Sequence, residues 1–181
     1  MIVFECDPGM EISGNLAISM LVNLQAENFQ PFLQKYGFAD VKPDQWYCYQ
    51  DFLNIFKEVS EQPGAMFDFV AVGMAAVDRY DLPAPIASMG LEEFFLNVMP
   101  TMMNRQYRNG TPSRVSIEKV AEKHLLIRTA TAYPDDTVYG FIYGLARRFA
   151  SKGSQFTLKY DENHLRHDFG SEHTLFHLTW K

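Results

Sequence analysis

The stretch YPDDTVYGFIYGLARRF, residues 133–149, has the pattern of a single well-delimited helix. Two aspartates, Asp135 and Asp136, stand at its beginning, and two arginines, Arg147 and Arg148, stand at its end. The dipole of a helix favours acidic side chains in the first turn and basic side chains in the last turn. The charges therefore predict where this helix begins and ends, without requiring a catalytic role for the paired acids.

Two glycines and two tyrosines lie inside this helix, each pair one turn apart. A glycine within a helix costs about 1 kcal/mol relative to alanine. Gly140 and Gly144 therefore predict the close approach of another backbone, most simply that of a sheet beneath the helix. Tyr139 and Tyr143 form the neighbouring stripe. They either line the edge of the docked helix or contribute to a ligand site.

The chain before this helix has helical spacing of its apolar side chains. Pro31 and Pro100 interrupt two of the patterns and predict a kink or break, and Asp44 is a candidate N-cap. DLPAPIAS, residues 81–88, is predicted to be a loop because of its two prolines. The expected helices lie within residues 14–37, 42–64, 65–80 and 91–110.

The second half alternates apolar and polar residues and predicts strands. Residues 113–134 have the pattern of a hairpin that turns near Glu122 and Lys123, and two more strands follow Gly153 on either side of a polar turn at 163–171. Helices followed by strands indicate an α+β fold. We expect an N-terminal helical layer packed on a four- to five-stranded antiparallel sheet, with one crossing helix between two hairpins. We expect one domain over residues 1–181, helical to about 110 and with the sheet and its helix over about 111–181.

Composition excludes several classes of function. The 181 residues carry a formal net charge of −6, and the longest basic cluster is ARR at 146–148, so no nucleic-acid partner is expected. No apolar run is long enough for a membrane span, and the N-terminus does not resemble a signal peptide. Cys6 and Cys48 form no CxxC pair, which is typical of a reducing compartment and predicts a cytoplasmic protein. Cys48, in QWYCYQ, is expected to be a buried structural thiol.

No catalytic or metal-binding motif is present in the sequence. It has no G-x-S-x-G elbow, no P-loop and no G-x-G-x-x-G. On a strand, His173 and His177 would lie about 13 Å apart at about 3.3 Å per residue, too far to share one ion. His164 and His167 could bind a metal with Asp168 or Glu172 only if the turn between the strands folded tightly. We therefore predict no catalytic residues and no metal site.

The order of these elements is similar to that of a known superfamily. A strand, the helix containing FIYGLARRF (141–149) and a strand pair ending in HTLFHLTW (173–180) resemble the C-terminal half of the H-NOX/vinyl-4-reductase/TRAPP-like superfamily. The resemblance covers about residues 85–181. It implies an α+β domain with helices first, then two strands, a helix and two strands. It also implies a domain that binds small molecules or tetrapyrroles, or serves in assembly and signalling.

The resemblance also sets an expectation about haem. It implies, for haem-binding H-NOX domains, an axial histidine on the helix before the sheet and a Tyr-x-Ser-x-Arg motif on the strand leading to the last helix. Residues 91–107 contain no histidine, and LIRTATAYP (126–134) has Arg128 and Tyr133 in the opposite order and no serine. We therefore expect no cofactor, with haem disfavoured, and leave a different hydrophobic ligand open.

The function expected from the sequence is a non-enzymatic small-molecule-binding or sensory module, forming a homodimer. Its site would be an apolar cavity between the helices and the sheet. The alternative is a structural module for dimerisation or adaptor contacts, with a solid core and no ligand. An enzyme acting on a small hydrophobic substrate comes third, because no nucleophile–base pair is visible. The residues expected to line the site are Phe94, Phe95, Met99, Tyr139 and Tyr143, with Arg105 or Arg128 as a polar anchor.

Overall fold

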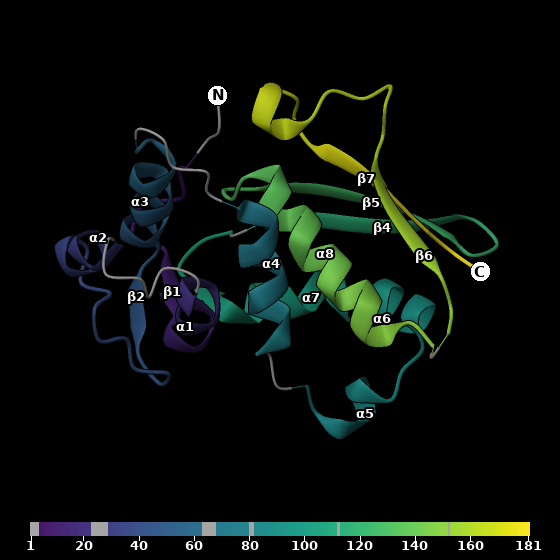
Figure 1. Ribbon diagram of the computed structural model, residues 1–181, viewed down its shortest axis with the longest axis horizontal. Coiled ribbons are helices and arrows are strands. Elements are labelled where there is room, and N and C mark those ends of the chain that lie inside the picture. Colours follow the sequence, from purple (N-terminus) through teal and green to yellow (C-terminus); the bar gives the residue numbers. More distant parts are fainter. Residues whose placement is uncertain (1–3, 23–28, 63–67, 80–81, 112, 152) are drawn as a thin grey trace.

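The computed structural model describes residues 4–22, 29–62, 68–79, 82–111, 113–151 and 153–181. Helices and a small sheet precede a four-stranded antiparallel sheet that carries one long helix, which confirms the predicted α+β class (Figure 1). Residues 23–28 of the first predicted helix, 63–64 of the second, and 65–67 and 80 of the third lie outside the described residues. The helices of the first half are α1 (Gly14–Leu21), α2 (Gln30–Lys35), α3 (Tyr49–Ser60), α4 (Phe69–Asp78), α5 (Ala84–Ala87), α6 (Leu91–Asn97), α7 (Met99–Met102) and the 3-10 helix η3 (Met103–Gln106).

The larger sheet has the strand order β4-β5-β7-β6, with antiparallel neighbours throughout. The two hairpins flank α8 (Asp135–Phe149), as predicted, and the first hairpin turns at Lys123, which has a positive φ of 57°. Alternate side chains such as Ile127 and Phe176 are fully buried on the face that α8 covers, and the intervening side chains face away. The strands are β4 (Ser113–Ala121), β5 (His124–Thr131), β6 (Phe156–Tyr160) and β7 (Thr174–Trp180), with the 3-10 helix η4 (His167–Phe169) before β7.

A second, three-stranded sheet was not predicted. Its strands β1 (Glu11–Ser13), β2 (Trp46–Cys48) and β3 (Tyr107–Arg108) pair in the order β2-β1-β3. Runs of two or three residues are too short to show a period of two in a sequence. The helix expected after Asp44 therefore begins only at Tyr49, because the residues before it pair with β1.

Two proline-containing segments also differ from expectation. The predicted loop at 81–88 contains the single helical turn α5, in which Pro85 lies in the first turn, where its missing N–H is not needed. The helix expected over 91–110 is divided after Asn97 into α6, α7 and η3, with Pro100 in the first turn of α7. The chain then becomes extended at Tyr107.

The glycines of α8 face another helix, and the expectation that they face the sheet is wrong. Figure 1 shows α4 and α8 side by side in front of the sheet. A Cβ atom on Gly140 would lie 2.0 Å from the carbonyl oxygen of Val70, and one on Gly73 would lie 2.0 Å from that of Thr137. The backbones of the two helices are therefore in direct contact at both glycines. No larger residue fits there without separating them.

The charged end of α8 strengthens the same contact. Arg147 donates from Nη2 to Oδ1 of Asp78 at 2.8 Å, and Arg148 donates from Nη1 to the carbonyl oxygen of Val77 at 3.2 Å. The Arg147 bond is an ion pair with a carboxylate, whereas Arg148 adds a second donor to a carbonyl at the C-terminus of α4 that also accepts the Arg79 N–H. Arg148 thus helps to cap α4, and both arginines complement the dipole of α8.

The tyrosines of α8 hold it on the sheet. The Tyr139 hydroxyl donates to the carbonyl oxygen of Leu158 at 3.0 Å, and its ring lies 5.3 Å from that of Tyr160. The Tyr143 ring lies 5.1 Å from that of Phe156. One side of α8 therefore packs on β6 through aromatic rings, while its glycine side packs on α4.

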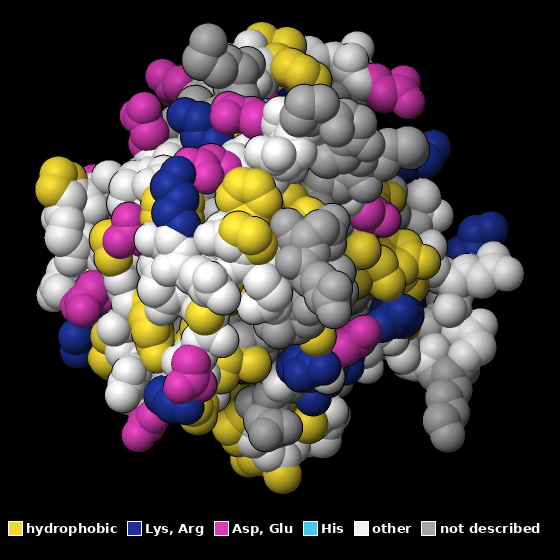
Figure 2. Space-filling model, turned by 60° about the vertical axis from the view of Figure 1, so that its left-hand side comes forward, with side chains coloured by type: hydrophobic (Ala, Val, Ile, Leu, Met, Phe, Trp, Pro, Cys, Tyr) yellow, Lys and Arg dark blue, Asp and Glu magenta, His cyan; other side chains and the backbone are white. Residues whose placement is uncertain are grey.

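The face shown in Figure 2 has no large patch of a single charge, because acidic, basic and hydrophobic side chains are interspersed on it. None of the helices in the described part of the chain combines the length and the apolar character that crossing a membrane requires.

Candidate functional site

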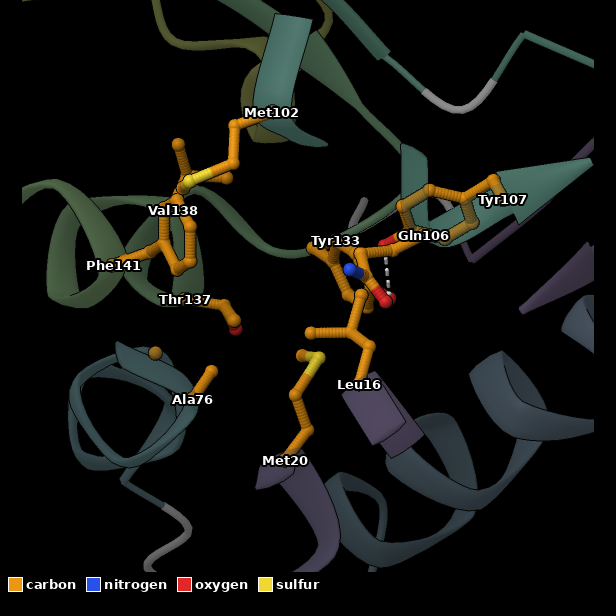
Figure 3. A pocket seen from close by; sticks show the side chains of 11 residues that line it. Leu16, Met20, Ala76, Met102, Gln106, Tyr107, Tyr133, Thr137, Val138 and Phe141 are labelled. Atoms are coloured by element: carbon orange, nitrogen blue, oxygen red, sulfur yellow. Dashed lines mark hydrogen bonds between the residues drawn. The ribbon is translucent and has the colours of Figure 1, made fainter. Parts of the chain in front are cut away.

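A small, partly open cavity lies where α1, α4, η3 and the first turns of α8 meet (Figure 3). Its volume, about 30 Å³ for the centres of water-sized molecules, exceeds the 10–15 Å³ that one water needs. The surface that lines it is apolar. The cavity therefore has room for a molecule of only a few heavy atoms. It is lined by Leu16, Met20, Gly73, Ala76, Met102, Gln106, Tyr107, Tyr133, Thr137, Val138 and Phe141.

One polar atom at this cavity has no partner. Thr137 is 4% exposed, and its Oγ1 makes no hydrogen bond within the described residues. In Figure 3 the side chains of Thr137, Ala76 and Met20 point toward the same central space. A buried hydroxyl without a partner costs about 1–3 kcal/mol. Thr137 is therefore the group that a ligand with a hydrogen-bonding atom would satisfy.

Buried tyrosines close the other side of the cavity. The hydroxyls of Tyr107 and Tyr133 share a hydrogen bond of 2.8 Å, and the ring of Tyr49 packs edge-on against both rings, with centroids 4.9 and 5.7 Å away. Burial raises the pKa of each of the three phenols, so they remain neutral at physiological pH. Tyr107 and Tyr133 supply hydroxyl groups and aromatic surface to the cavity but no charge, and Tyr49 packs against them without lining it.

The predicted site residues do not come together at this cavity. Phe94, Phe95 and Met99 are fully buried in the core, where the Phe94 ring stacks on that of Phe149 at 3.7 Å. None of the three lines the cavity, although Met102 of the following turn does. The helical spacing of the sequence identifies such apolar side chains as buried, but it cannot tell which of them border a void.

The remaining predicted residues lie on other surfaces. Tyr139 and Tyr143 dock α8 on β6, as described above. Arg105 is exposed on η3, and Arg128 is exposed on the face of the sheet that α8 does not cover. The site residues missed from the sequence include Tyr133 and Thr137. Their position directly before and within the first turn of α8 was visible, but their burial was not.

The histidines form hydrogen bonds to one another and to an acid, without forming a metal site. His124 Nε2 lies 2.9 Å from His177 Nδ1, and His177 Nε2 lies 2.9 Å from Oδ2 of Asp161. Hydrogen bonds from His177 and from the Asn163 backbone lower the pKa of Asp161. The described residues contain no group of three or more histidine, cysteine, aspartate or glutamate side chains placed to hold a metal ion.

The two cysteines differ from the expectation. Cys48 is exposed at the end of β2, because the short strand turns its side chain outward, so its predicted burial is wrong. Cys6 is partly buried, and burial, followed by the nearby Cys48 and Asp7, raises its pKa to about 11.

Two buried carboxylates fix the beginning of α8. The Asp135 N–H donates to Oδ2 of Asp168 at 2.9 Å, and the Asp168 N–H donates to Oδ2 of Asp135 at 3.0 Å. The Thr174 hydroxyl donates to Asp135 Oδ1 at 2.7 Å. Burial, with the charge of Asp135 beside it, raises the pKa of Asp168 to about 6. This reciprocal pair ties η4 and β7 to the helix end from which Thr137 reaches the cavity.

Comparison with solved structures finds H-NOX domains over nearly the whole chain. No family model and no curated protein sequence matches it. A doubly substituted variant of the Tt H-NOX domain has a TM-score of 0.68 and 18% identity, covering 94% of this chain and 95% of that one. An oxygen-binding H-NOX domain related to soluble guanylate cyclases gives 0.67 and 16%, covering 93% and 92%. An H-NOX protein from S. oneidensis in the Fe(II)NO state gives 0.64 and 14%, covering 94% and 99%.

These neighbours correct one expectation and confirm another. The prediction of no cofactor, with haem disfavoured, is contradicted, because the neighbours are haem-binding H-NOX domains; one of their structures concerns the modulation of haem redox potential by porphyrin distortion. The resemblance inferred from the strands around α8 is confirmed and extends to the N-terminal half. The chain has an H-NOX-like fold.

Proposed function

We propose that this chain is a small-molecule-binding sensory domain whose ligand occupies the cavity between α1, α4, η3 and α8. The observation that carries the proposal is the small apolar cavity with the Thr137 hydroxyl at its wall, which has no partner among the described residues. The H-NOX-like fold supports it, since two of the neighbours were solved with a small molecule bound, oxygen in one and NO in the other. No nucleophile–base pair lines the cavity, so the role proposed is binding without catalysis.

The lining determines which molecules fit. A charged molecule would be buried without a counter-ion, because the lining residues carry no ionised side chain. An uncharged molecule of a few heavy atoms would bury its apolar part against Leu16, Met20 and Phe141. A hydrogen-bonding atom on it would reach the Thr137 hydroxyl. The ligand class is therefore small, neutral and at most weakly polar.

The walls of the cavity provide a route from binding to a change of shape. α1 and α4 belong to the N-terminal half and α8 to the C-terminal half, and all three contribute to the lining. At Gly73 and Gly140 the backbones of α4 and α8 are already in contact, so the two helices cannot move closer together there. A ligand larger than the cavity therefore has to move α4 relative to α8, because close-packed interiors transmit such displacements.

Haem is the group that the structural neighbours imply. The cavity lining is therefore compared with the iron ligands and the space that haem requires. Haem iron is held in proteins by histidine, cysteine, methionine or tyrosine. The lining contains methionines and tyrosines but no histidine or cysteine, and the hydroxyls of Tyr107 and Tyr133 bond to each other. Only about 30 Å³ is open to the centres of water-sized molecules, so the cavity as it stands does not hold a porphyrin. In this arrangement the described lining does not fit haem, and no step of the proposal passes through it.

The first test examines the freshly purified protein and then loads it. Native mass spectrometry and a UV–visible spectrum show whether a molecule or haem accompanies the chain, and haemin is then titrated while the Soret band is followed. A Soret band that saturates at one haem per chain would show that the chain binds haem at a specific site. It would overturn the small-ligand proposal.

The second test probes the cavity itself with xenon, which enters dry apolar cavities. Xenon NMR of the wild type is expected to show saturable binding. Ala76→Leu, which fills the space beside Thr137, should abolish it. Ala75→Leu is the matched control, because Ala75 lies on the same helix but does not line the cavity. Equal xenon binding by both variants, or none by the wild type, would contradict the cavity site and favour a module without a ligand. The homodimer expected from the sequence stays a prediction, which the native mass also tests.

A further inference from the structure

A second hollow, of about 350 Å³, lies beside the face of the larger sheet that α8 leaves uncovered. Three segments adjacent in the sheet contribute to it: β4, β5 and the residues just before β7. Asn104 of η3 adds a wall. The volume is in the range of small-molecule sites. We call this hollow the sheet cleft. It shares no lining residue with the apolar cavity between α1, α4, η3 and α8.

Two arginines of the sheet cleft stand on neighbouring strands. Arg114 pairs in register with Ala130, and Ser116 pairs with Arg128, so the two arginines are diagonal neighbours on one face. Neither forms an ion pair or a hydrogen bond within the described residues. By contrast, Arg108 and Arg147 are each engaged with a carboxylate. In a chain of net charge −6, these two guanidinium groups are donors without an acceptor.

One further polar group of the cleft, the His173 imidazole, can serve an anion. Ser113 also borders the cleft, but it alternates with Arg114 along β4, so its buried hydroxyl lies on the other face of the sheet from the two arginines. His173 stacks on His164 with ring centroids 4.5 Å apart. Its pKa is lowered by partial burial and then by the positive charges of His164, Arg128 and Arg114. That effect shows that His173 lies within the field of both arginines.

The charges of the cleft select the kind of anion. Its ionisable lining consists of Arg114 and Arg128, one acid, Glu172, and His173, so the arginines outnumber the acid. Guanidinium groups bind phosphate through two parallel hydrogen bonds, and a phosphate monoester offers three acceptor oxygens and close to two negative charges at neutral pH. A carboxylate would satisfy only one of the two guanidinium groups in this way.

We propose that the sheet cleft is a binding site for a phosphate monoester, with Arg114 and Arg128 holding the phosphate and the His173 imidazole adding a donor. The cleft is larger than a phosphate ion, so it has room for part of the molecule that carries the ester. This site does not depend on the function proposed for the apolar cavity.

The test is calorimetric titration of the full chain with inorganic phosphate and with O-phosphoserine, at constant ionic strength set with sodium chloride. Both probes are expected to bind saturably, with phosphoserine binding at least as tightly. Arg128→Gln and Arg114→Gln should each weaken binding by at least about tenfold, the effect of losing hydrogen bonds to a charged group. Arg79→Gln, which removes the same charge from an exposed position at the end of α4, is the matched control and should leave binding unchanged.

A spectroscopic readout separates a local site from a general effect of charge. The bound dianion should raise the pKa of His173, seen in its imidazole NMR resonances, while the resonances of the more distant His124 stay constant. Absence of saturable binding by the wild type overturns the proposal. An equal loss of affinity in Arg79→Gln, in a variant whose thermal unfolding is unchanged, overturns it as well. Binding of inorganic phosphate but not of phosphoserine would overturn the monoester assignment.

Discussion

The contact between α4 and α8 can be tested by adding a single methyl group to α8. Gly140→Ala places a Cβ atom 2.0 Å from the Val70 carbonyl oxygen, and the next two contacts, at 2.8 and 2.9 Å, are also with the Val70 backbone. Because the obstacle is backbone, no side-chain rotation relieves it. α4 must move away by about 1 Å, since real Cβ contacts are essentially never shorter than 3.0 Å.

The magnitude follows from two opposing effects. Forcing an extra methyl group into a packed interior costs about 1–3 kcal/mol, and the upper value applies here because the neighbour is rigid. Replacing glycine by alanine within a helix returns about 1 kcal/mol. We therefore expect Gly140→Ala to lower the free energy of unfolding by about 2 kcal/mol. For a domain of this size that corresponds to a fall in Tm of about 4–8 °C.

Gly144→Ala is the control, one turn further along the same face. Its Cβ would meet only the side chain of Val77, at 3.1 and 3.2 Å, which a shift of a few tenths of an ångström relieves. The gain in helix propensity is the same, so this variant should stay within about 1 kcal/mol of the wild type. Urea unfolding followed by circular dichroism gives both values. If Gly140→Ala is as stable as Gly144→Ala, the backbone contact described here is wrong.

The buried polar groups and the thiols lead to three further predictions. Thr137→Val removes an unpartnered hydroxyl and should raise the free energy of unfolding by about 1 kcal/mol in urea titrations, while weakening any cavity ligand that has a hydrogen-bonding atom. The rise in the pKa of Asp168 from 3.8 to about 6 means that the folded state binds the proton more tightly, so stability should fall by up to about 3 kcal/mol as pH increases through that range. Asp168→Asn should abolish this fall, as chemical denaturation at several pH values would show. Iodoacetamide at pH 8 should modify exposed Cys48 at least about 100-fold faster than Cys6, whose pKa near 11 leaves little thiolate, and peptide mass spectrometry would reveal the reverse order.

The sequence was sufficient to predict the helices and strands whose hydrophobic pattern repeats over many residues. It was insufficient to predict which of these elements contact one another. Alternation over 113–134 and the charged ends of α8 predicted the sheet module, and Lys123 was correctly placed in the turn. The small sheet was missed because pairing of two- or three-residue strands depends on partners far along the chain. The low helix propensity of glycine likewise predicted that Gly140 lies close to another backbone. It could not show whether that backbone belongs to the sheet or to another helix.

The site was less predictable than the fold for the same reason. Phe94, Phe95 and Met99 were correctly expected to be buried, yet the void lies one turn further along, at Met102. The cavity forms where the side chains of α1, α4, η3 and α8 leave space between them. The sequence of any one of these segments therefore cannot predict it. Arg128 was expected to be an anchor at the cavity mouth. The period of two places it beside buried Ile127 and Thr129, on the opposite face of the sheet.

The pairing of α4 with α8 also has a consequence for the order in which the chain can fold during synthesis. α4 buries Val72, Ala76 and Val77, and its principal partner begins only at Asp135, after the whole of the first hairpin. At about 5–20 residues per second, the ribosome needs several seconds to extend the chain from the end of α4 to the end of α8. For that interval α4 can pack only on earlier elements such as α1, and the part of its apolar side that α8 covers stays exposed. We expect the nascent N-terminal half to depend on chaperones until α8 leaves the exit tunnel.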